Sequence, residues 1–298
     1  MNNIVERIKN TMVIDETILL PKSLKIELVN ICNHKCKYCV VPYVKESNHF
    51  MSDEIFYKAV QEAYRLNITE IGLFHMGEGT LHPKFNDYID YIRDNYPNIN
   101  IFITSNGTQL NKLKHCIKKN INSIKISLNG YNKQFHKDVT GVDTFELIMD
   151  HINQLVEYRN TINSSTQISA SSIYYNNPEQ EHFVQNISKV VDCFYYTEIF
   201  THAGKVNNTH IELSNDNRII KNFVSLPCNG MYNLCHIKVN GDINLCKWGV
   251  DNEFVIGNIM NDDIQTLWSS DKVKQLRYKA NNHLLDTCNK CVGISNGL

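Results

Sequence analysis

Three cysteines stand close together in the segment ICNHKCKYC, with the spacing C-x3-C-x2-C. Cys32, Cys36 and Cys39 directly follow an apolar run that is typical of a β-strand. Three thiolates from one short loop can hold three irons of a 4Fe–4S cluster and leave the fourth iron open to a chelating small molecule. Structural zinc is the alternative. It needs four ligands, and His34 lies too close in sequence to complete a tetrahedron easily.

A second group of four cysteines occupies the C-terminal part of the chain. Cys228, Cys246, Cys288 and Cys291 have the spacing C-x17-C-x41-C-x2-C. By spacing alone, this pattern fits a zinc ribbon about as well as an iron–sulfur site. A 4Fe–4S cluster with four thiolate ligands has no vacant iron, so it would be suited to transferring an electron and not to binding a ligand.

The composition restricts the partners and the compartment. Thirty Lys and Arg against 31 Asp and Glu give a net charge of −1, which excludes a general basic footprint for nucleic acid. No apolar run approaches the ~18 residues that span a bilayer, and Glu6 and Arg7 interrupt the opening segment where a signal peptide would be apolar. We therefore expect a cytoplasmic protein without membrane contact, whose ten cysteines do not form a disulfide framework.

From residue 24 to about residue 200, short apolar runs alternate with stretches of helical period, as in βα units around a parallel sheet. Six strands are predicted, at 25–31, 69–75, 99–105, 123–128, 167–174 and 191–200. Ser52 is predicted to cap one amphipathic helix, and Asp143 followed by Glu146 to open another. These helices are expected to cover one side of the sheet.

The alternation within two of these strands indicates a polar cavity. In the fourth strand, Lys125, Ser127 and Asn129 alternate with apolar residues, and in the third strand Thr104 and Asn106 do the same. A sheet curled beneath its helices would turn this polar set inward, which suggests a ligand cavity. The alternative is a pair of half-buried strands with one solvated face, although parallel strands are normally covered on both sides.

After about residue 205 the pattern changes. Apolar runs at 236–239 and 243–245 flank Asn240-Gly241-Asp242, a strong hairpin signal, and a lone helix containing Trp268 is expected before the last cysteine pair. We therefore expect an N-terminal extension (1–22), a larger α/β unit (23–205) and a small C-terminal unit (206–298).

The cysteine triplet, with the aromatic Tyr38 before its third member, resembles the motif of the radical S-adenosylmethionine (radical SAM) superfamily. The resemblance implies a partial (β/α)6 barrel of the α/β class. It also implies that S-adenosylmethionine (SAM) binds the open iron and is cleaved to a 5'-deoxyadenosyl radical, with flavodoxin or ferredoxin as the expected electron donor. Tyr38 is then expected to lie at the SAM site.

Three further segments resemble SAM-binding elements of that family. His75-Met76-Gly77-Glu78-Gly79 resembles the GGEP motif, which implies that Glu78 accepts a hydrogen bond from the methionine ammonium and that Gly77 permits close backbone approach. The TSNGT and ISLNG segments resemble two other elements, which makes Asn106 and Ser127 the expected ribose and carboxylate contacts. Thr140 stands where the family often has an Arg that pairs with the carboxylate, and Lys137 is a possible substitute.

The second cysteine set resembles the abbreviated Twitch form of the SPASM domain, together with the Gly257-Asn258-Ile259 and Leu267-Trp268 segments. This resemblance implies a small α+β domain in which the four cysteines hold an auxiliary 4Fe–4S cluster. The expected cofactors are therefore two 4Fe–4S clusters and SAM. Because few residues follow Cys291, we expect one auxiliary cluster and not two.

The layout most resembles the aminocyclitol dehydrogenase group of butirosin biosynthesis. It predicts hydrogen abstraction from a carbohydrate-like or other small molecule, with oxidation of an alcohol and the auxiliary cluster as electron acceptor. The short stretch before Cys32 makes a peptide substrate less expected. Epimerisation or peptide modification is the alternative, with Cys235 as catalytic hydrogen donor, and a non-enzymatic metal-binding module is a remote one. Candidate substrate contacts at the ends of strands are His75, Lys125, Tyr174, Glu198 and His202.

Overall fold

The computed structural model describes residues 20–41, 50–175, 177–197, 206, 228–249 and 252–291. Its centre is one mixed sheet of nine strands in the order β6-β5-β4-β3-β2-β1-β7-β8-β9. The strands are β1 (Ser23–Ile26), β2 (Glu70–Gly72), β3 (Asn100–Ser105), β4 (Ser123–Ser127), β5 (Gln167–Ile173), β6 (Cys193–Thr197), β7 (Leu234–Ile237), β8 (Asp242–Asn244) and β9 (Val255–Asn258).

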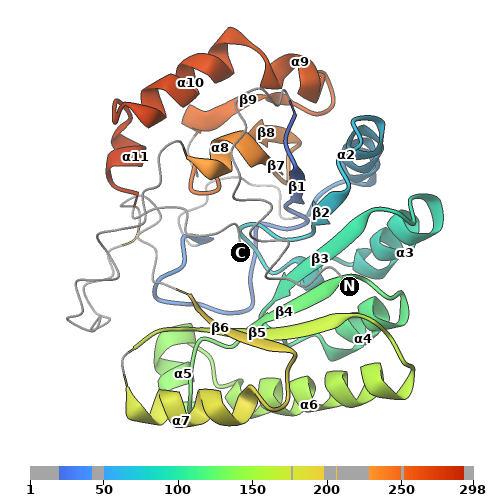
Figure 1. The fold of residues 1–298 in the computed structure, drawn as a ribbon, viewed down its shortest axis with the longest axis vertical. Coiled ribbons are helices and arrows are strands. Elements are labelled where there is room, and N and C mark those ends of the chain that lie inside the picture. Colours follow the sequence, from blue (N-terminus) through green and yellow to red (C-terminus); the bar gives the residue numbers. More distant parts are fainter. Residues whose placement is uncertain are drawn as a thin grey trace.

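The six strands from β1 to β6 are parallel and neighbour one another in chain order. They form an open, curved sheet and not a closed barrel (Figure 1). Each predicted strand overlaps one of them, so the partial (β/α)6 barrel is confirmed. The strands themselves are shorter than the predicted runs. After β1 and β2, the remaining predicted residues, 27–31 and 73–75, follow the strands at the carboxyl edge of the sheet, where barrel enzymes place their sites.

Helices between the parallel strands cover the outer side of the curved sheet (Figure 1). They are α2 (Asp53–Arg65), α3 (Phe85–Asn95), α4 (Leu110–Lys118), α5 (Lys133–Thr140), α6 (Phe145–Thr161) and α7 (Pro178–Ile187). The apolar faces of the other five helices pack against the strands in one large core, whereas Phe135 and Val139 of α5 belong to a small separate cluster with Ile173 and Tyr175. The other side of the sheet holds the loop that follows β1 (Figure 1).

The predicted N-terminus is correct for one of the two helices and wrong for the other. Ser52 caps α2 as expected, because its hydroxyl accepts a hydrogen bond from the Ile55 amide at 3.4 Å. The prediction that Asp143 opens the second helix is wrong by one residue, because Thr144 is the N-cap of α6. Asp143 instead pairs with Lys133 at 3.5 Å.

The C-terminal part combines a hairpin with short helices. The predicted hairpin is present as the antiparallel pair β7 and β8, and Gly241 in its turn has a φ of 88°. The prediction of a lone helix before the last cysteine pair is wrong. Three helices lie there: α9 (Ile264–Trp268), α10 (Asp271–Asn281) and α11 (Asp286–Asn289). Ser270 separates the first two, because its side chain caps α10 by accepting from the Val273 amide.

The small C-terminal part shares its sheet with the larger one. β7 lies parallel to β1 and pairs with it along all four residues, from Ser23 with Leu234 to Ile26 with Ile237. The β1 strand is therefore an interior strand of the sheet, which explains why all four of its residues are buried. Within the described residues, no helix has the length and apolar character needed to cross a membrane.

Candidate active site

A cavity of about 240 Å³ opens at the carboxyl edge of the parallel strands. Its wall is built from the loop after β1, from the ends of β2 to β6, and from two residues that follow β8. The predicted polar faces of β3 and β4 do line it, with Thr104 and Asn106 from one and Lys125, Ser127 and Asn129 from the other. The inference of a polar cavity from strand alternation is therefore confirmed.

The C-terminal end of α5 holds the loop that carries Cys32, Cys36 and Cys39. The Lys35 amide donates to the Thr140 carbonyl at 2.8 Å, and the Lys37 amide donates to the Val139 carbonyl at 2.9 Å. These carbonyls lie in the last turn of α5, where a helix has no internal donors left for them. The helix end therefore fixes the loop, and Cys32, Cys36 and Cys39 all line the cavity.

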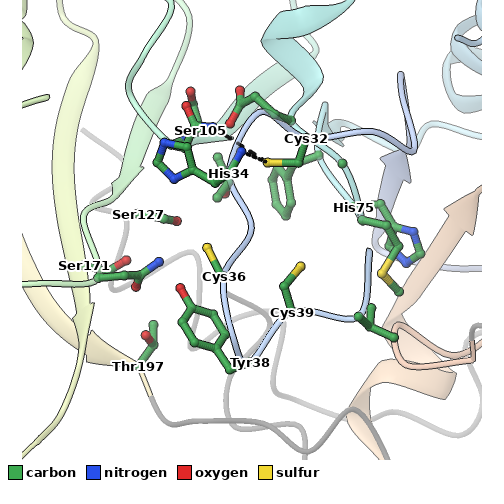
Figure 2. Close-up of a pocket in the computed structure, with 18 of the residues that line it drawn as sticks. Cys32, His34, Cys36, Tyr38, Cys39, His75, Ser105, Ser127, Ser171 and Thr197 are labelled. Atoms are coloured by element: carbon green, nitrogen blue, oxygen red, sulfur yellow. Dashed lines mark hydrogen bonds between the residues drawn. The ribbon is translucent and has the colours of Figure 1, made fainter. Parts of the chain in front are cut away.

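The three thiols form a donor set that fits an iron–sulfur cluster. Burial raises the pKa of Cys32 to about 11 and of Cys36 to about 12, and the neighbouring Cys39 thiol adds to both increases. Three partly buried thiols that raise one another's pKa hold negative charge poorly by themselves, and iron binding would stabilise the thiolates. Figure 2 shows the thiols of Cys36 and Cys39 side by side.

No three His, Cys, Asp or Glu side chains in the described part of the chain lie close enough to share a single metal ion. A cubic four-iron cluster places its thiolates further apart, because each one binds a different iron. Tyr38 stands beside this set, with its hydroxyl toward the Cys36 thiol (Figure 2). It also lines the cavity, as expected for a residue at the SAM site.

Gly77 and Glu78 pack directly against the cysteine loop. The Glu78 amide donates to the Ile31 carbonyl at 2.9 Å. A Cβ atom at Gly77 would lie 2.4 Å from the Val29 carbonyl oxygen and 2.5 Å from the Ile31 carbonyl oxygen. Only a glycine allows this approach, as the sequence predicts.

The Glu78 carboxylate links two of the SAM-like motifs. It accepts from the Thr80 amide at 3.2 Å, from the Thr80 hydroxyl, and from the Asn106 amide at 2.6 Å. Burial raises the pKa of Glu78, and these hydrogen bonds oppose the increase. The side-chain amide of Asn106 in turn donates to Asn33 at 2.6 Å and approaches the Cys32 sulfur at 3.8 Å. Both residues line the cavity.

The expected substitute for the missing Arg is not at the cavity. Lys137 is exposed on α5 and is not among the lining residues. Thr140 is fully buried, and its hydroxyl donates to the His136 carbonyl at 2.7 Å. The last turn of α5 is occupied in holding the cysteine loop, so neither residue reaches the cavity. The lysines that line it are Lys125 and Lys247.

The structure brings the second cysteine set together from three elements. Cys228 precedes α8 (Asn229–Asn233), Cys246 follows β8, and Cys288 and Cys291 lie in and after α11. The Cys246 thiol interacts electrostatically with the other three, and burial is the main cause that raises its pKa. Four converging cysteines are the donor set expected for the auxiliary cluster.

Cys235 does not face the cavity. It lies in β7, is fully buried in the core, and pairs with Leu24 of β1. Side chains alternate along a strand, and the next residue, His236, lies against His75, with 4.9 Å between the ring centroids. Because His75 lines the cavity, Cys235 points to the opposite face of the sheet. The expectation that it faces the active site is therefore wrong.

Several cavity residues were not predicted. Ser171 and Thr197 lie at the ends of β5 and β6, and Lys247 and Trp248 directly follow Cys246. Strand alternation in QISASSI could have identified Ser171, whose buried hydroxyl has no hydrogen-bond partner among the described residues. Nothing in the sequence indicates that the segment after Cys246 reaches the cavity.

Of the candidate substrate contacts, His75 and Lys125 line the cavity, whereas Tyr174 does not. Glu198 and His202 lie outside the described residues.

Comparison with protein families identifies both parts of the chain. A profile described as "Radical SAM superfamily" matches residues 26–169, and one described as an "Iron-sulfur cluster-binding domain", SPASM, matches residues 228–292. Among curated proteins, the probable GTP 3',8-cyclase of Thermococcus kodakarensis is 28% identical over 46% of this chain and 44% of its own length. The GTP 3',8-cyclase of Klebsiella pneumoniae is 29% identical over 44% and 41%. The chain spans about half the length of these relatives or less.

Solved structures share the fold over nearly the whole chain. BtrN in complex with AdoMet and 2-DOIA matches with a TM-score of 0.63 and 16% identity, over 94% of this chain and 96% of that one. Streptococcus suis SuiB bound to the precursor peptide SuiA matches with a TM-score of 0.68 and 16% identity, over 92% and 69%. The chain therefore contains a radical SAM domain followed by a SPASM-type iron–sulfur cluster-binding domain, and these domains imply an enzyme that uses SAM and iron–sulfur clusters.

Proposed function

We propose that this enzyme oxidises an alcohol of a carbohydrate-like or other small molecule, and that it contains two 4Fe–4S clusters. When bound, the first cluster supplies the electron that cleaves SAM to methionine and a 5'-deoxyadenosyl radical, and the second accepts an electron from the substrate. The chain itself holds both clusters, orients SAM and the substrate, and shields the radical from water.

The observation that carries this proposal is the position of Lys247 and Trp248. They line the same cavity as Cys32, Cys36 and Cys39, and they directly follow Cys246 of the second cysteine set. An auxiliary cluster held by that set would therefore border the substrate cavity. This neighbourhood is what an electron acceptor requires, whereas a cluster with only a structural role could lie anywhere in the C-terminal part.

The cavity wall suits a polar small molecule. Hydroxyl, amide and amino groups from β3 to β6 reach it, including those of Thr104, Lys125, Ser127, Ser171 and Thr197 (Figure 2). Such groups can orient the several hydroxyls of a sugar or cyclitol. BtrN, with the same fold over almost its whole length, is described in complex with 2-DOIA, which supports this substrate class. Flavodoxin or ferredoxin is the proposed electron donor.

Anaerobic turnover tests the proposal. The reconstituted enzyme receives SAM, reduced flavodoxin and, in separate reactions, 2-DOIA, a panel of other cyclitols and aminosugars, and GTP. We expect about eight irons per chain and release of 5'-deoxyadenosine in step with a carbonyl product from at least one alcohol, read by mass spectrometry. A cyclised product from GTP, or an alcohol recovered with inverted configuration, would contradict the oxidation.

A further inference from the structure

One imidazole nitrogen of His75, a residue that lines the cavity, has no hydrogen-bond partner among the described residues. The His75 side chain is 3% exposed, and its Nε2 atom is buried without a hydrogen-bond partner among the described residues. His75 follows β2 and lies across the cavity from Ser171 and Thr197 (Figure 2). A buried imidazole nitrogen without a partner is costly, so it points to a ligand group that completes its hydrogen bond.

A carboxylate holds the other nitrogen of the same ring. His75 Nδ1 lies 3.2 Å from Oε1 of Glu27, the residue that follows β1. The second carboxylate oxygen accepts from the Val239 amide at 3.0 Å. Burial raises the pKa of Glu27, but the hydrogen bonds from His75 and Val239, together with the charges of His75 and Lys238, lower the pKa overall. The carboxylate is therefore ionised near neutral pH.

This contact fixes the tautomer of His75. A carboxylate accepts hydrogen bonds and donates none, so Nδ1 carries the proton and donates to Glu27. In the neutral ring, Nε2 is then the nitrogen without a proton, which can accept a hydrogen bond. The ring beside it, His236, is neutral, because burial and the nearby His75, Lys25 and Lys247 lower its pKa well below the ordinary value. Its Nδ1 lies 3.3 Å from the Asn244 carbonyl oxygen.

We propose that the Glu27–His75 pair binds the substrate hydroxyl at Nε2 and accepts its proton during oxidation. This inference rests on the proposed function. Hydrogen abstraction from the carbinol carbon by the 5'-deoxyadenosyl radical gives 5'-deoxyadenosine and leaves a carbon radical that bears the hydroxyl. The O–H bond then breaks, its proton goes to Nε2, one electron goes to the auxiliary iron–sulfur cluster, and the C=O bond forms. The substrate loses two electrons and two hydrogens in total.

The variant His75→Gln distinguishes two roles of the side chain, accepting a hydrogen bond from the substrate hydroxyl and accepting its proton. A glutamine amide oxygen can accept the substrate hydroxyl but does not take its proton. The probe is 2-DOIA, or the alcohol of the panel that the wild type oxidises, with deuterium at the carbinol carbon. We expect binding in the presence of SAM, measured by calorimetry, to stay within about threefold of the wild type. Deuterium should still enter 5'-deoxyadenosine, while carbonyl formation falls on the order of 100-fold.

His115→Gln is the matched control. His115 also pairs with a carboxylate, Asp90 at 2.7 Å, but it lies on α4 and outside the cavity lining. This variant should keep the wild-type ratio of carbonyl to 5'-deoxyadenosine. Glu27→Gln should also lower the ratio, because the amide no longer fixes the tautomer as strongly.

Two outcomes would overturn the inference and are distinguishable. If His75→Gln keeps carbonyl formation at the wild-type level, or loses binding and deuterium transfer together with it, the histidine is not the proton acceptor and the proposed oxidation stands. If the wild type forms no carbonyl from any alcohol of the panel, the proposed function fails and the inference fails with it.

Discussion

At the scale of single residues, the sequence predicted the metal-ligand candidates, because their spacing along the chain is characteristic. The cysteine triplet and the second cysteine set both converge in the structure, because ligands to one cluster must be close in space. Glu27 and His236 could not be predicted, because strands far apart in the sequence bring them to His75. The expected role of Cys235 was wrong for the same reason. The neighbouring strands decide to which side of the sheet the side chains of a short strand point.

Glu78→Gln tests a residue that holds two motifs together. The amide cannot accept from Thr80 and Asn106 with both of its polar atoms, so the Asn106 segment should lose its place against the cysteine loop. Losing a charge-assisted hydrogen bond costs about 1.5 to 3 kcal/mol, so SAM affinity should fall roughly 10- to 100-fold. Equilibrium binding of SAM to the reconstituted variant measures this, with iron content as the control. Unchanged affinity together with unchanged iron would show that Glu78 has no part in the SAM site.

At the scale of elements, the hydrophobic period and the alternation of polar and apolar residues predicted the strands and the side of the sheet that their polar residues face. The six parallel strands and the inward polar faces of β3 and β4 follow from alternation. Helix ends were less predictable, as at Thr144 and Ser270, because short polar residues can cap a helix or join an ion pair and the choice is made by tertiary contacts. The reach of the segment after β8 into the cavity also depends on packing and not on local sequence.

Gly77→Ala tests how the loop after β2 supports the cysteine loop. The added methyl group would meet two backbone oxygens, of Val29 and Ile31, and neither can move as a side chain can. The cysteine loop must therefore shift, and we expect iron at the first site and 5'-deoxyadenosine formation to fall together, each at least severalfold. Iron analysis and chromatography on the anaerobically reconstituted variant provide the measurement. Full iron content with full SAM cleavage would show that this close approach is dispensable.

At the scale of the whole molecule, one sheet runs through both predicted units. The sequence indicated where the pattern changes, near residue 205, but not that β7 would extend the sheet beside β1. The pairing of two distant strands leaves no signal in the local sequence. The apolar residues of β1 and β7 indicate only that each strand is buried. The β1–β7 pair and the hairpin after it therefore join Cys246 to the larger unit, and the next residues, Lys247 and Trp248, line the cavity.

A chain shortened to residues 1–205 tests this continuity. It would leave β1 as an exposed edge and uncover Leu24 and Ile26, which are fully buried in the intact chain. We expect the shortened protein to aggregate or to elute as large species in size-exclusion chromatography, whereas the chain of residues 1–298 does not. A soluble, monodisperse fragment with native circular dichroism would show that the larger unit folds without β7.

The central claim is that SAM is cleaved at the cysteine triplet in this cavity. The most direct measurement is 5'-deoxyadenosine formed from SAM under reducing, anaerobic conditions by the wild type, by Cys36→Ala and by Cys193→Ala. Cys193 lies half-buried in β6 and does not line the cavity, so its loss is the matched control. We predict formation by the wild type and the Cys193 variant and none above background with Cys36→Ala, because two thiolates cannot hold the cluster. Formation of 5'-deoxyadenosine by Cys36→Ala at the rate of the control would contradict the account.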